Sequence, residues 1–379
     1  MKCKLSDICS FRRGKVSVDR LNTNNYISTE NMLPNKGGIT EASSLPTVPL
    51  TQEYRKGDVL VSNIRPYFKK IWKAKYDGGC SNDVLVFAAN SNTDKDFLYY
   101  ILANDEFFAY SMATSKGTKM PRGDKTSIMQ YEVPVMDIEL QRRIASILKS
   151  IDEKIELNNA INNNLEEQAQ AIFENEFLSL QSLPDGWKQA SLIDIADYLN
   201  GLAMQKYRPS ANEIGIPVLK IKELRQGCCD DNSEFCSPSI KSDYIIHDGD
   251  VIFSWSGSLL VDFWCGGICG LNQHLFKVSS SNYDKWFYYA WTKHHLDRFI
   301  AVAADKATTM GHIKRDELAK AEVLIPNETD YNRIGALLQP IYDLIISNRI
   351  ENKKLAETRD SLLPKLMSGE IDMSEVDYE

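Results

Sequence analysis

The chain repeats itself once along its length, and this duplication limits its possible folds more than any other feature. Four stretches recur about 190 residues further on: 4–8 in 191–195, 56–62 in 248–254, 97–100 in 286–289, and 141–148 in 331–338. A solenoid repeat has roughly 20 to 50 residues, whereas this one is long enough for a domain with an appendage. The sequence therefore predicts a pseudo-two-fold dimer within one polypeptide, an arrangement that suits a two-fold target.

The composition is that of an ordinary globular protein. Of the 379 residues, 43% are hydrophobic and 25% are charged, which is usual for such proteins. No apolar run approaches the roughly 20 residues that a membrane span needs. The first residues also lack the apolar stretch of a signal peptide. We expect a protein without membrane contact, located in the cytoplasm.

The eight cysteines are expected to be free thiols. None belongs to a Cys-x-x-Cys pair, and thiols stay reduced in the cytosol. A zinc site is the alternative, and its ligands would be Cys228, Cys236, Cys265 and Cys269. All five histidines lie in the second copy, so none belongs to chemistry that both copies share. We therefore expect no bound metal and no cofactor.

Each copy begins with a larger part that is typical of an α+β domain, with predicted boundaries at 1–137 and 183–328. Short β-like runs lie between turn signals, at 59–62, 84–87, 216–221 and 251–254. One helical segment comes late in each part, at 95–109 and 283–300. We expect the aromatic residues of these segments to lie in the core of each domain rather than on a stacking surface.

The smaller part of each copy is a long helix, predicted at 138–182 and 329–370, and an acidic tail follows at 371–379. Apolar residues recur every seven positions, which is the pattern of a coiled coil. The a positions are Ile144, Ile151, Asn158, Leu165 and Ile172 in the first helix, and Ile334, Ile341, Asn348, Leu355 and Leu362 in the second. At ~1.5 Å per residue, each helix extends about 45 to 55 Å. We expect an antiparallel coiled coil, with Gly335 and Pro340 bending the start of the second helix.

Asparagine occupies the third a position of both helices, at Asn158 and Asn348. A buried asparagine at such a position costs stability, but it penalises wrong registers in which its amide lacks a partner. In an antiparallel pair centred on its midpoint, the two amides would lie close together and set the register. The alternative is a solvent-facing polar turn that interrupts the apolar stripe.

The net charge of −8 does not by itself favour a nucleic-acid partner, for which a basic surface is usual. The charges are segregated along the chain, however. Residues 65–75 and 116–125 are strongly basic, whereas acidic residues collect in the first long helix and after Gly369. Basic patches can coexist with the acidic total, so charge alone leaves the question open.

Several short motifs occur in matching order in the two copies. An apolar run with a proline leads into each long helix, at 133–135 before 141–148 and at 323–326 before 333–338, and further motifs lie at 184–187, 215–218 and 362–371. Together they resemble the specificity subunit of type I restriction–modification systems, over essentially the whole chain. The second copy departs from the family's Glu-Gln at the start of the helix, since Asp330-Tyr331-Asn332 stands there.

The resemblance implies a protein that recognises double-stranded DNA and has no catalytic residues of its own. Each globular part would be a target-recognition domain that reads one half of a bipartite, asymmetric site, and the helices would set the spacing. The helices would also dock two methyltransferase subunits and, through them, restriction and translocation subunits. Accordingly, the chain lacks the Asn/Asp-Pro-Pro-Tyr/Phe motif of a methyltransferase and the Gly-x4-Gly-Lys-Ser/Thr motif of a translocase.

The DNA-binding residues that we predict combine positive charge with hydroxyl or aromatic groups. Lysine and arginine bind phosphates, while short polar side chains reach base edges. The loops late in each domain supply most of them: Lys116, Thr118, Lys119, Arg122 and Lys125 in the first copy, and Lys306, Thr308, Thr309, His312, Lys314 and Arg315 in the second. A second set alternates charge with aromatic rings: Arg65, Tyr67, Lys69 and Lys70, with Lys206, Tyr207 and Arg208 in the other copy. For any one residue the alternative is an ordinary solvated loop or amphipathic strand.

A coiled-coil scaffold that binds proteins and not DNA is the alternative function. Its globular parts would present peptide- or protein-binding surfaces, and it would not need the basic loops of both copies on one side. The two copies share their framework and differ most in their loops. This pattern favours two readers of different half-sites.

Overall fold

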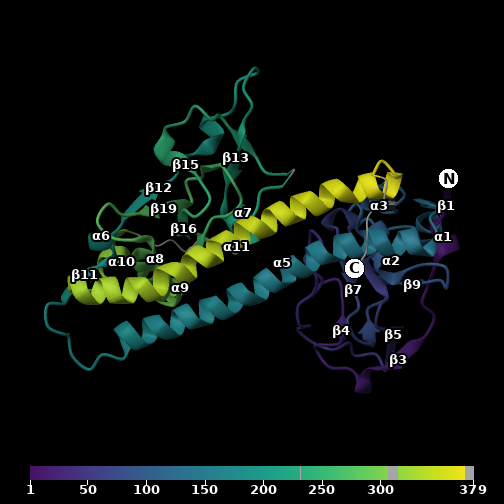
Figure 1. The fold of residues 1–379 in the computed structure, drawn as a ribbon, viewed down its shortest axis with the longest axis horizontal. Coiled ribbons are helices and arrows are strands. Elements are labelled where there is room, and N and C mark those ends of the chain that lie inside the picture. The colour runs from purple at the N-terminus through teal and green to yellow at the C-terminus, as the bar shows by residue number, and fades with distance from the viewer. Residues whose placement is uncertain (231, 306–314, 372–379) are drawn as a thin grey trace. The chain divides into compact units, whose positions relative to one another are not determined.

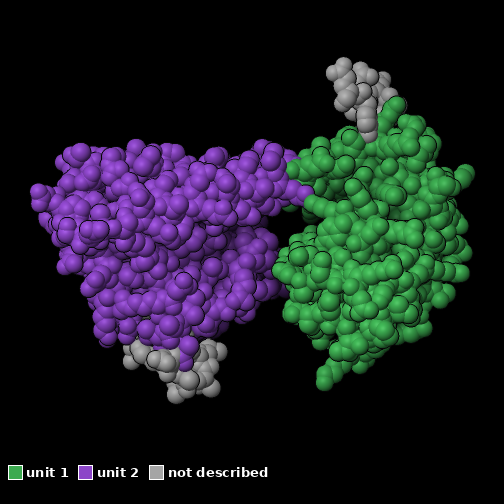
Figure 2. All heavy atoms as spheres, turned by 90° about the horizontal axis from the view of Figure 1, so that it is seen from below, with its two compact units in different colours: residues 1–153, 355–379 green, residues 154–354 purple. Residues whose placement is uncertain are grey.

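The computed structural model describes residues 1–230, 232–305 and 315–371 (Figure 1). The chain forms two compact units: unit 1 is Met1–Glu153 with Leu355–Glu379, and unit 2 is Lys154–Lys354 (Figure 2). Each long helix therefore contributes one segment to each unit. Among the described residues, no helix is both long and apolar enough to cross a membrane.

Unit 1 consists mainly of short strands, with its helices late in the sequence. The strands are β1 (Lys2–Lys4), β2 (Cys9–Phe11), β3 (Lys15–Ser17), β4 (Tyr26–Ile27), β5 (Leu50–Tyr54), β6 (Val59–Ser62), β7 (Ile71–Lys73), β8 (Gly78–Cys80), β9 (Val84–Ala89) and β10 (Glu132–Pro134). The helices and helical turns are α1 (Leu5–Ile8), η1 (Val18–Arg20), η2 (Pro66–Phe68), α2 (Lys95–Ala103), α3 (Asp105–Ala113), α4 (Lys125–Ile128) and the start of α5 (Ile138–Phe173).

Three sheets organise the strands of unit 1. The first has the order β2-β9-β6-β7 with antiparallel neighbours, and the second has the order β3-β5-β8-β4, in which β4 and β8 run parallel. The strands β1 and β10 pair in a third sheet. All four residues of β6 are buried. Because successive side chains point to opposite faces of a sheet, β6 is covered on both faces, which explains its apolar run Val59–Val61.

Unit 2 has the same plan. Its strands are β11 (Lys188–Ser191), β12 (Asp197–Asn200), β13 (Ile216–Leu219), β14 (Phe235–Cys236), β15 (Ile245–Ile246), β16 (Val251–Ser254), β17 (Leu260–Phe263), β18 (Cys269–Leu271), β19 (Leu275–Ser279) and β20 (Glu322–Ile325). Its helices and helical turns are η3 (Glu174–Leu178), α6 (Leu192–Ile195), η4 (Met204–Lys206), α7 (Ile221–Gln226), η5 (Ser242–Tyr244), α8 (Lys285–His294), α9 (Leu296–Asp305), α10 (Arg315–Ala319) and most of α11 (Glu328–Ser368). The sheet order β12-β19-β16-β17 matches β2-β9-β6-β7 strand for strand. In the smaller sheet, of order β14-β13-β18-β15, the parallel pair β13–β18 matches β4–β8, but the edge strand β14 lies beside β13, whereas β3 lies beside β5.

Some predicted elements end earlier than the apolar pattern suggests. The helix predicted at 95–109 is two helices, because Asn104 has an extended backbone and its side chain accepts a hydrogen bond from the Glu106 N–H (3.1 Å). The helix predicted at 283–300 also divides, at His295, although the backbone of His295 stays in the right-handed helical region. The strand predicted at 216–221 stops at Leu219, because α7 begins two residues later.

The long helices are α5 and α11, and α5 continues into a single π-helical turn, η3. Helix α11 continues without interruption through Gly335 and Pro340. Gly335 has a packing role, since a Cβ atom there would lie 2.9 Å from Trp286 Nε1. The glycine therefore allows α11 to pack closely against the indole of α8.

Asparagine side chains join α5 and α11 inside unit 2. Asn158 Nδ2 donates to Asn352 Oδ1 (2.9 Å), and Asn348 Nδ2 donates to Asn162 Oδ1 (2.9 Å). The order of the partners along the chain shows that these segments run antiparallel. Asn158 and Asn348 are only 1% and 8% exposed, so neither is a solvent-facing interruption. Each bonds to an asparagine one helical turn further along the other helix, and their role in setting the register stays a prediction.

The C-terminal part of α11 belongs to the core of unit 1. Its residues Leu363, Leu366 and Met367 pack with Ile144 and Leu148 of α5 in one cluster that also includes α2 and α3. At the edge of this cluster, Arg359 donates to Asp152 Oδ1 (2.6 Å), and Tyr100 donates to Asp152 Oδ2 (2.7 Å). The Asp152 carboxylate thus links α2, α5 and α11.

We expect Arg359→Ala to destabilise unit 1. Removing the guanidinium leaves the largely buried Asp152 carboxylate without its cation, which should cost about 2 to 3 kcal/mol. Urea-unfolding midpoints of the variant and the wild type measure this change. The exposed Lys149–Glu153 pair is the control, because Lys149→Ala should change the free energy of unfolding by less than ~0.5 kcal/mol. Equal effects of the two substitutions would contradict the role of the Asp152 contact.

We expect His295 to make unit 2 less stable in acid. His295 is buried, its Nε2 donates to the Glu322 carbonyl (2.8 Å), and burial lowers its pKa to about 4. The unfolded chain, with a histidine pKa near ~6.5, binds the proton more readily, so stability is full above that pH and falls by about 2 kcal/mol towards pH 4. His295→Gln retains the donor and cannot titrate, so its unfolding free energy should depend less on pH. An unchanged slope in that variant would rule out His295 as the source.

Candidate nucleic-acid interface

The two basic segments predicted in the first copy come together in unit 1. One of them connects β6 to β7, and the other connects α3 to α4. The Arg65 N–H donates to the Pro121 carbonyl (2.8 Å), and the Gly123 N–H donates to the Asn63 carbonyl (3.2 Å). A Cβ atom on Gly123 would lie 2.8 Å from Asn63 Oδ1, so the approach of the two segments requires a glycine. We call the surface formed by residues 63–70 and 116–125 the basic surface.

The backbone of the basic surface is closely constrained. Arg65 and Lys69 flank η2, and both have φ of 50°, the left-handed region that non-glycine residues rarely adopt. In the second segment, Lys116 and Arg122 exchange two backbone hydrogen bonds of 2.9 and 3.0 Å, which close a hairpin. The exposed tip of this hairpin therefore stands on a fixed base.

In the first segment, the aromatic residues are the more accessible ones. Tyr67 is 48% exposed, and its ring centroid lies 4.7 Å from that of Phe68. Lys69 forms an ion pair with Asp105 (2.8 Å), and Lys70 Nζ donates to the Thr29 carbonyl (2.6 Å). Partial burial lowers the pKa of Lys70. These two lysines are thus oriented by contacts within unit 1.

In the second segment, two cations are paired with acids and two are open to solvent. Lys116 Nζ lies 2.5 Å from Asp124 Oδ2, and Arg122 lies 3.1 Å from Asp83 Oδ1. The hydrogen bonds from Lys116 and Ser127 lower the pKa of Asp124 to about 2.

The open cations are Lys119 and Lys125, and Thr118 is exposed beside Lys119. Neither lysine has an ion pair with any residue in the described ranges. They are therefore the members of the predicted set most available to a phosphate.

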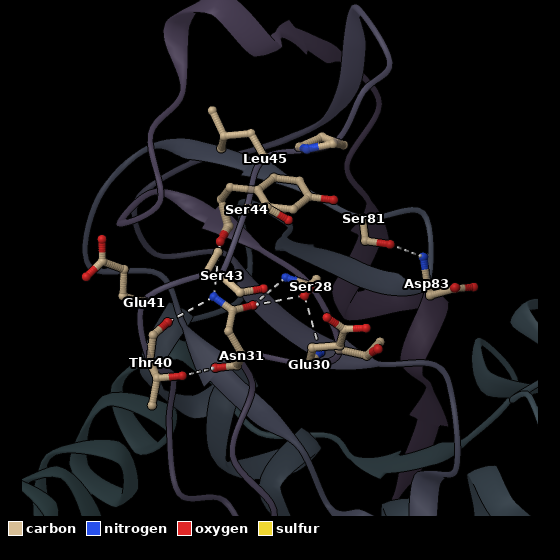
Figure 3. A pocket seen from close by; sticks show the side chains of 14 residues that line it. Ser28, Glu30, Asn31, Thr40, Glu41, Ser43, Ser44, Leu45, Ser81 and Asp83 are labelled. Atoms are coloured by element: carbon tan, nitrogen blue, oxygen red, sulfur yellow. Dashed lines mark hydrogen bonds between the residues drawn. The ribbon is translucent and has the colours of Figure 1, made fainter.

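A polar pocket of about 370 Å³ adjoins the basic surface (Figure 3). Its walls include the carboxylates of Glu30, Glu41 and Asp83 together with several serine hydroxyls, and no lysine or arginine lines it. The amide of Asn31 is fully engaged, since it accepts from the Ser28 N–H and donates to backbone carbonyls. Asp83 belongs both to the pocket wall and to the ion pair with Arg122. The pocket therefore presents hydrogen-bond acceptors next to a cationic surface.

The predicted residues of the second copy lie in several places. Lys206 ends η4, and Arg208 forms an ion pair with Glu234 (3.2 Å). With Tyr207, they follow β12, whereas the first-copy set connects β6 to β7, so the two sets do not occupy equivalent positions. Arg315 begins α10 and donates to the Tyr198 carbonyl (3.3 Å). The remaining predicted residues lie outside the described residues: Lys306, Thr308, Thr309, His312 and Lys314.

Comparison with known proteins assigns this chain to a family. The model of the type I restriction modification DNA specificity domain matches twice, over residues 1–167 and 184–357. The chain belongs to that family. Its characterised relatives are specificity subunits, the non-catalytic DNA-recognition subunits of type I restriction enzymes. The resemblance inferred from the short motifs is confirmed. The alternative function, a scaffold that binds proteins and not DNA, is not confirmed.

Two curated relatives and one solved structure illustrate the likeness. The MjaIX specificity subunit of Methanocaldococcus jannaschii is 26% identical over 306 residues, which cover 74% of this chain and 70% of the relative. The HindI specificity subunit of Haemophilus influenzae is 22% identical over 430 aligned positions, covering 91% and 94%. The crystal structure of the type I restriction–modification S subunit from M. genitalium aligns with a TM-score of 0.56 at 15% identity, covering 99% of this chain and 96% of that one. At 15% identity, this structural likeness shows a shared fold and nothing more.

In this specificity subunit, the half-buried aromatic residue Trp255 was missed by sequence reasoning. Trp255 directly follows β16, at the position that Asn63 has after β6, and its Nε1 donates to Asn200 Oδ1 (3.0 Å). The signal was present, because the match between 56–62 and 248–254 places Trp255 opposite Asn63. Because tryptophan carries no charge, a pattern of positive charge does not identify it.

The cysteines of the specificity subunit form no metal centre in the described part of the chain. All eight are free thiols, and no group of three or more histidine, cysteine or acidic residues is placed to hold a metal ion within those ranges. The alternative zinc site at Cys228, Cys236, Cys265 and Cys269 is therefore not supported. Cys269 has a different partner, since its Sγ lies 3.5 Å from the Sγ of Cys229.

Proposed function

We propose that this specificity subunit binds double-stranded DNA at an asymmetric site in two parts. The domain of residues 1–137 reads one half, the domain of residues 183–328 reads the other, and the long helices at 138–182 and 329–370 set the spacing. The same helices dock two methyltransferase subunits, and restriction and translocation subunits join through these. The complex works in the cytoplasm, and an acidic tail at 371–379 follows the second helix.

The convergence of the two basic segments in unit 1 is the observation that carries this proposal. Segments about 50 residues apart in sequence meet at one surface, where Lys119 and Lys125 are open to solvent. The neighbouring pairs hold Arg122 and Lys116 in defined positions. Mobile cations suffice for binding any duplex, whereas oriented side chains are needed to choose among base pairs.

The difference between the two units supports an asymmetric site. Their main sheets correspond strand for strand, yet the connection between the third and fourth strands of the main sheet is Asn63–Lys70 in unit 1 and Trp255–Leu259 in unit 2. The first is cationic, and the second has no charge. Two readers with different side chains on the same framework should recognise different sequences.

The long helices suit the role of a spacer. Helix α5 has 36 residues and α11 has 41, so each extends about 54 Å or more at ~1.5 Å per residue. This length exceeds one turn of duplex DNA, roughly 34 Å. The asparagine pairs and the ion pair between Arg349 and Glu166 (2.8 Å) support an antiparallel coiled coil with a single register.

Exposed apolar side chains on these helices support the docking of partner subunits. Leu157 and Ile161 lie one turn apart on α5, and Leu337 and Leu344 lie two turns apart on α11. Large apolar groups that stay exposed on a helix mark an interaction surface when they recur on one face. In this proposal, the methyltransferase subunits cover them.

The proposal predicts salt-dependent binding to a bipartite sequence. We expect the complex with the cognate methyltransferase subunit to prefer one such sequence over random duplexes, with an affinity that falls as salt rises. Lys119→Ala should remove about one phosphate contact and reduce the slope of log affinity against log salt by ~0.9, without changing the preferred sequence. Titration of labelled duplexes at several salt concentrations measures both quantities.

Lys4→Ala is the matched control for this experiment, because Lys4 is an exposed lysine of unit 1 on β1, outside the basic surface. It should leave the slope unchanged. Equal affinity of the wild-type complex for every duplex would refute the proposed function. A slope that changes equally in both variants would refute the assignment of Lys119.

The spacer role predicts that longer helices recognise more distant half-sites. Four residues inserted in each helix, between Glu153 and Lys154 and between Lys354 and Leu355, add about 6 Å. The spacer should grow by one to two base pairs at ~3.4 Å per pair, while both half-sites stay the same. Sequencing of the methylated sites in cells that carry the complex measures this outcome. The control is Asn163→Ala, an exposed change in α5 that preserves its length, and an unchanged spacer in the lengthened variant would contradict the role.

A further inference from the structure

One short turn is repeated in the two units with the same geometry. In unit 1 it is residues 81–83, which connect β8 to β9, and in unit 2 it is residues 272–274, which connect β18 to β19. Each turn has three residues and leads from the smaller mixed sheet into the main antiparallel sheet. The middle residue carries an amide side chain in both copies: Asn82 and Gln273.

Hydrogen bonds define the turn of unit 1. The Val84 N–H donates to the Ser81 carbonyl (3.0 Å), and the Asp83 N–H donates to Ser81 Oγ (3.3 Å). The Ser81 N–H donates to the Ile27 carbonyl (2.8 Å), which extends the parallel pairing of β4 and β8. The first and third residues are thus held by the framework. In the described part of the chain, no hydrogen bond engages the amide of Asn82, which is exposed.

The same hydrogen bonds define the turn of unit 2. The Leu275 N–H donates to the Asn272 carbonyl (3.0 Å), and the His274 N–H donates to Asn272 Oδ1 (3.3 Å). The Asn272 N–H donates to the Leu219 carbonyl (3.2 Å), next to the parallel pair of β13 and β18. Gln273 Nε2 lies 3.3 Å from His274 Nε2, which leaves its Oε1 and one N–H available to a ligand.

Each turn also adjoins the segment that follows the third strand of the main sheet. In unit 1, the Asn63 N–H donates to the Asp83 carbonyl (2.8 Å), and the Asp83 side chain pairs with Arg122 of the basic surface. In unit 2, the His274 ring centroid lies 6.2 Å from that of Trp255. The two middle residues therefore occupy the same place on the framework, beside the side chains that distinguish the units.

We propose that Asn82 and Gln273 are specificity-determining residues, and that each reads an adenine in the half-site of its own unit. This inference rests on the proposed function. A carboxamide has one acceptor and one donor side by side, and these match the N6 amino group and N7 of adenine in the major groove. The hydrogen bonds of the turn fix the backbone that carries each amide, so only the side-chain rotamer freedom is lost when the amide pairs. The third residue of the turn is Asp83 in unit 1 and His274 in unit 2. The base pair next to the adenine can therefore differ between the two half-sites.

Alanine variants in the assembled methyltransferase complex test the assignment. Asn82→Ala should abolish the preference for adenine at one position of one half-site, a loss of roughly 5- to 150-fold in discrimination. Gln273→Ala should do the same in the other half-site. A library of duplexes with every single-base change in the wild-type site measures the discrimination position by position, and sequencing of methylated sites in cells provides a second readout.

Isosteric variants keep the test decisive if an alanine variant fails to fold. Asn82→Asp and Gln273→Glu preserve the shape of the side chain and remove its donor. A carboxylate accepts from the N4 amino group of cytosine, so the preference at that one position should move from adenine towards cytosine.

Exposed asparagines at the other end of the same strand pairs are the matched controls. Asn24 precedes β4 and Asn212 precedes β13, and Asn24→Ala and Asn212→Ala should leave every position unchanged. If the variants at Asn82 and Gln273 keep wild-type discrimination at all positions, the turn does not read bases and the inference fails while the proposed function stands. If the wild-type complex shows no sequence preference at all, the proposed function itself fails.

Discussion

Two buried amide pairs join α5 to α11, and we predict that the register of the two helices depends on them. The repeat length of about 190 residues relates the two pairs. Asn158 of the first pair corresponds to Asn348 of the second, and Asn352 of the first pair corresponds to Asn162 of the second. One contact is therefore made twice, as expected of a local two-fold axis across the helix seam. An apolar seam tolerates sliding by a heptad, whereas a displaced amide would be buried without a partner. A single register of the two helices stays the prediction that these pairs support.

The globular units combine a fixed framework with exchangeable connections. Their central strands, such as β6 and β16, are buried at every position and, apart from a final serine, apolar. The connections after these strands carry Asn63–Lys70 in one unit and Trp255–Leu259 in the other. Side chains that differ in charge can thus be placed at one location without disturbing the sheets. This separation of framework from contact residues is what a protein with two related readers requires.

Much of the architecture could be predicted from local patterns, and the parts that failed depend on contacts distant in sequence. The duplication, the apolar runs of β6 and β16 and the two long helices follow from periodicity within short windows. Strands of two residues, such as β4 and β14, have no such pattern, because their pairing is imposed by neighbours. The break at Asn104 depends on a capping contact that an apolar stripe does not reveal.

The candidate site was predicted in part, for the same physical reason. Charge identified Lys116–Lys125 and Arg65–Lys70, but only the fold places them side by side. Their junction depends on Gly123, which has no charge to attract notice. The amides of Asn82 and Gln273 were missed because a single exposed amide in a turn is common in any sequence. Their equivalence becomes visible only when the hydrogen bonds of the two turns are compared.

The division of the helices between the units also has a consequence for synthesis on the ribosome. Unit 2 is one continuous stretch, Lys154–Lys354, whereas unit 1 takes Leu363, Leu366 and Met367 of α11 into its core. A nascent chain emerges from its N-terminus, and domains generally fold as their sequence becomes complete. The first unit to be translated is therefore the last that can close its core. Until the end of α11 has emerged, Ile144 and Leu148 remain partly uncovered. This folding intermediate therefore exposes apolar surface to which a chaperone could bind.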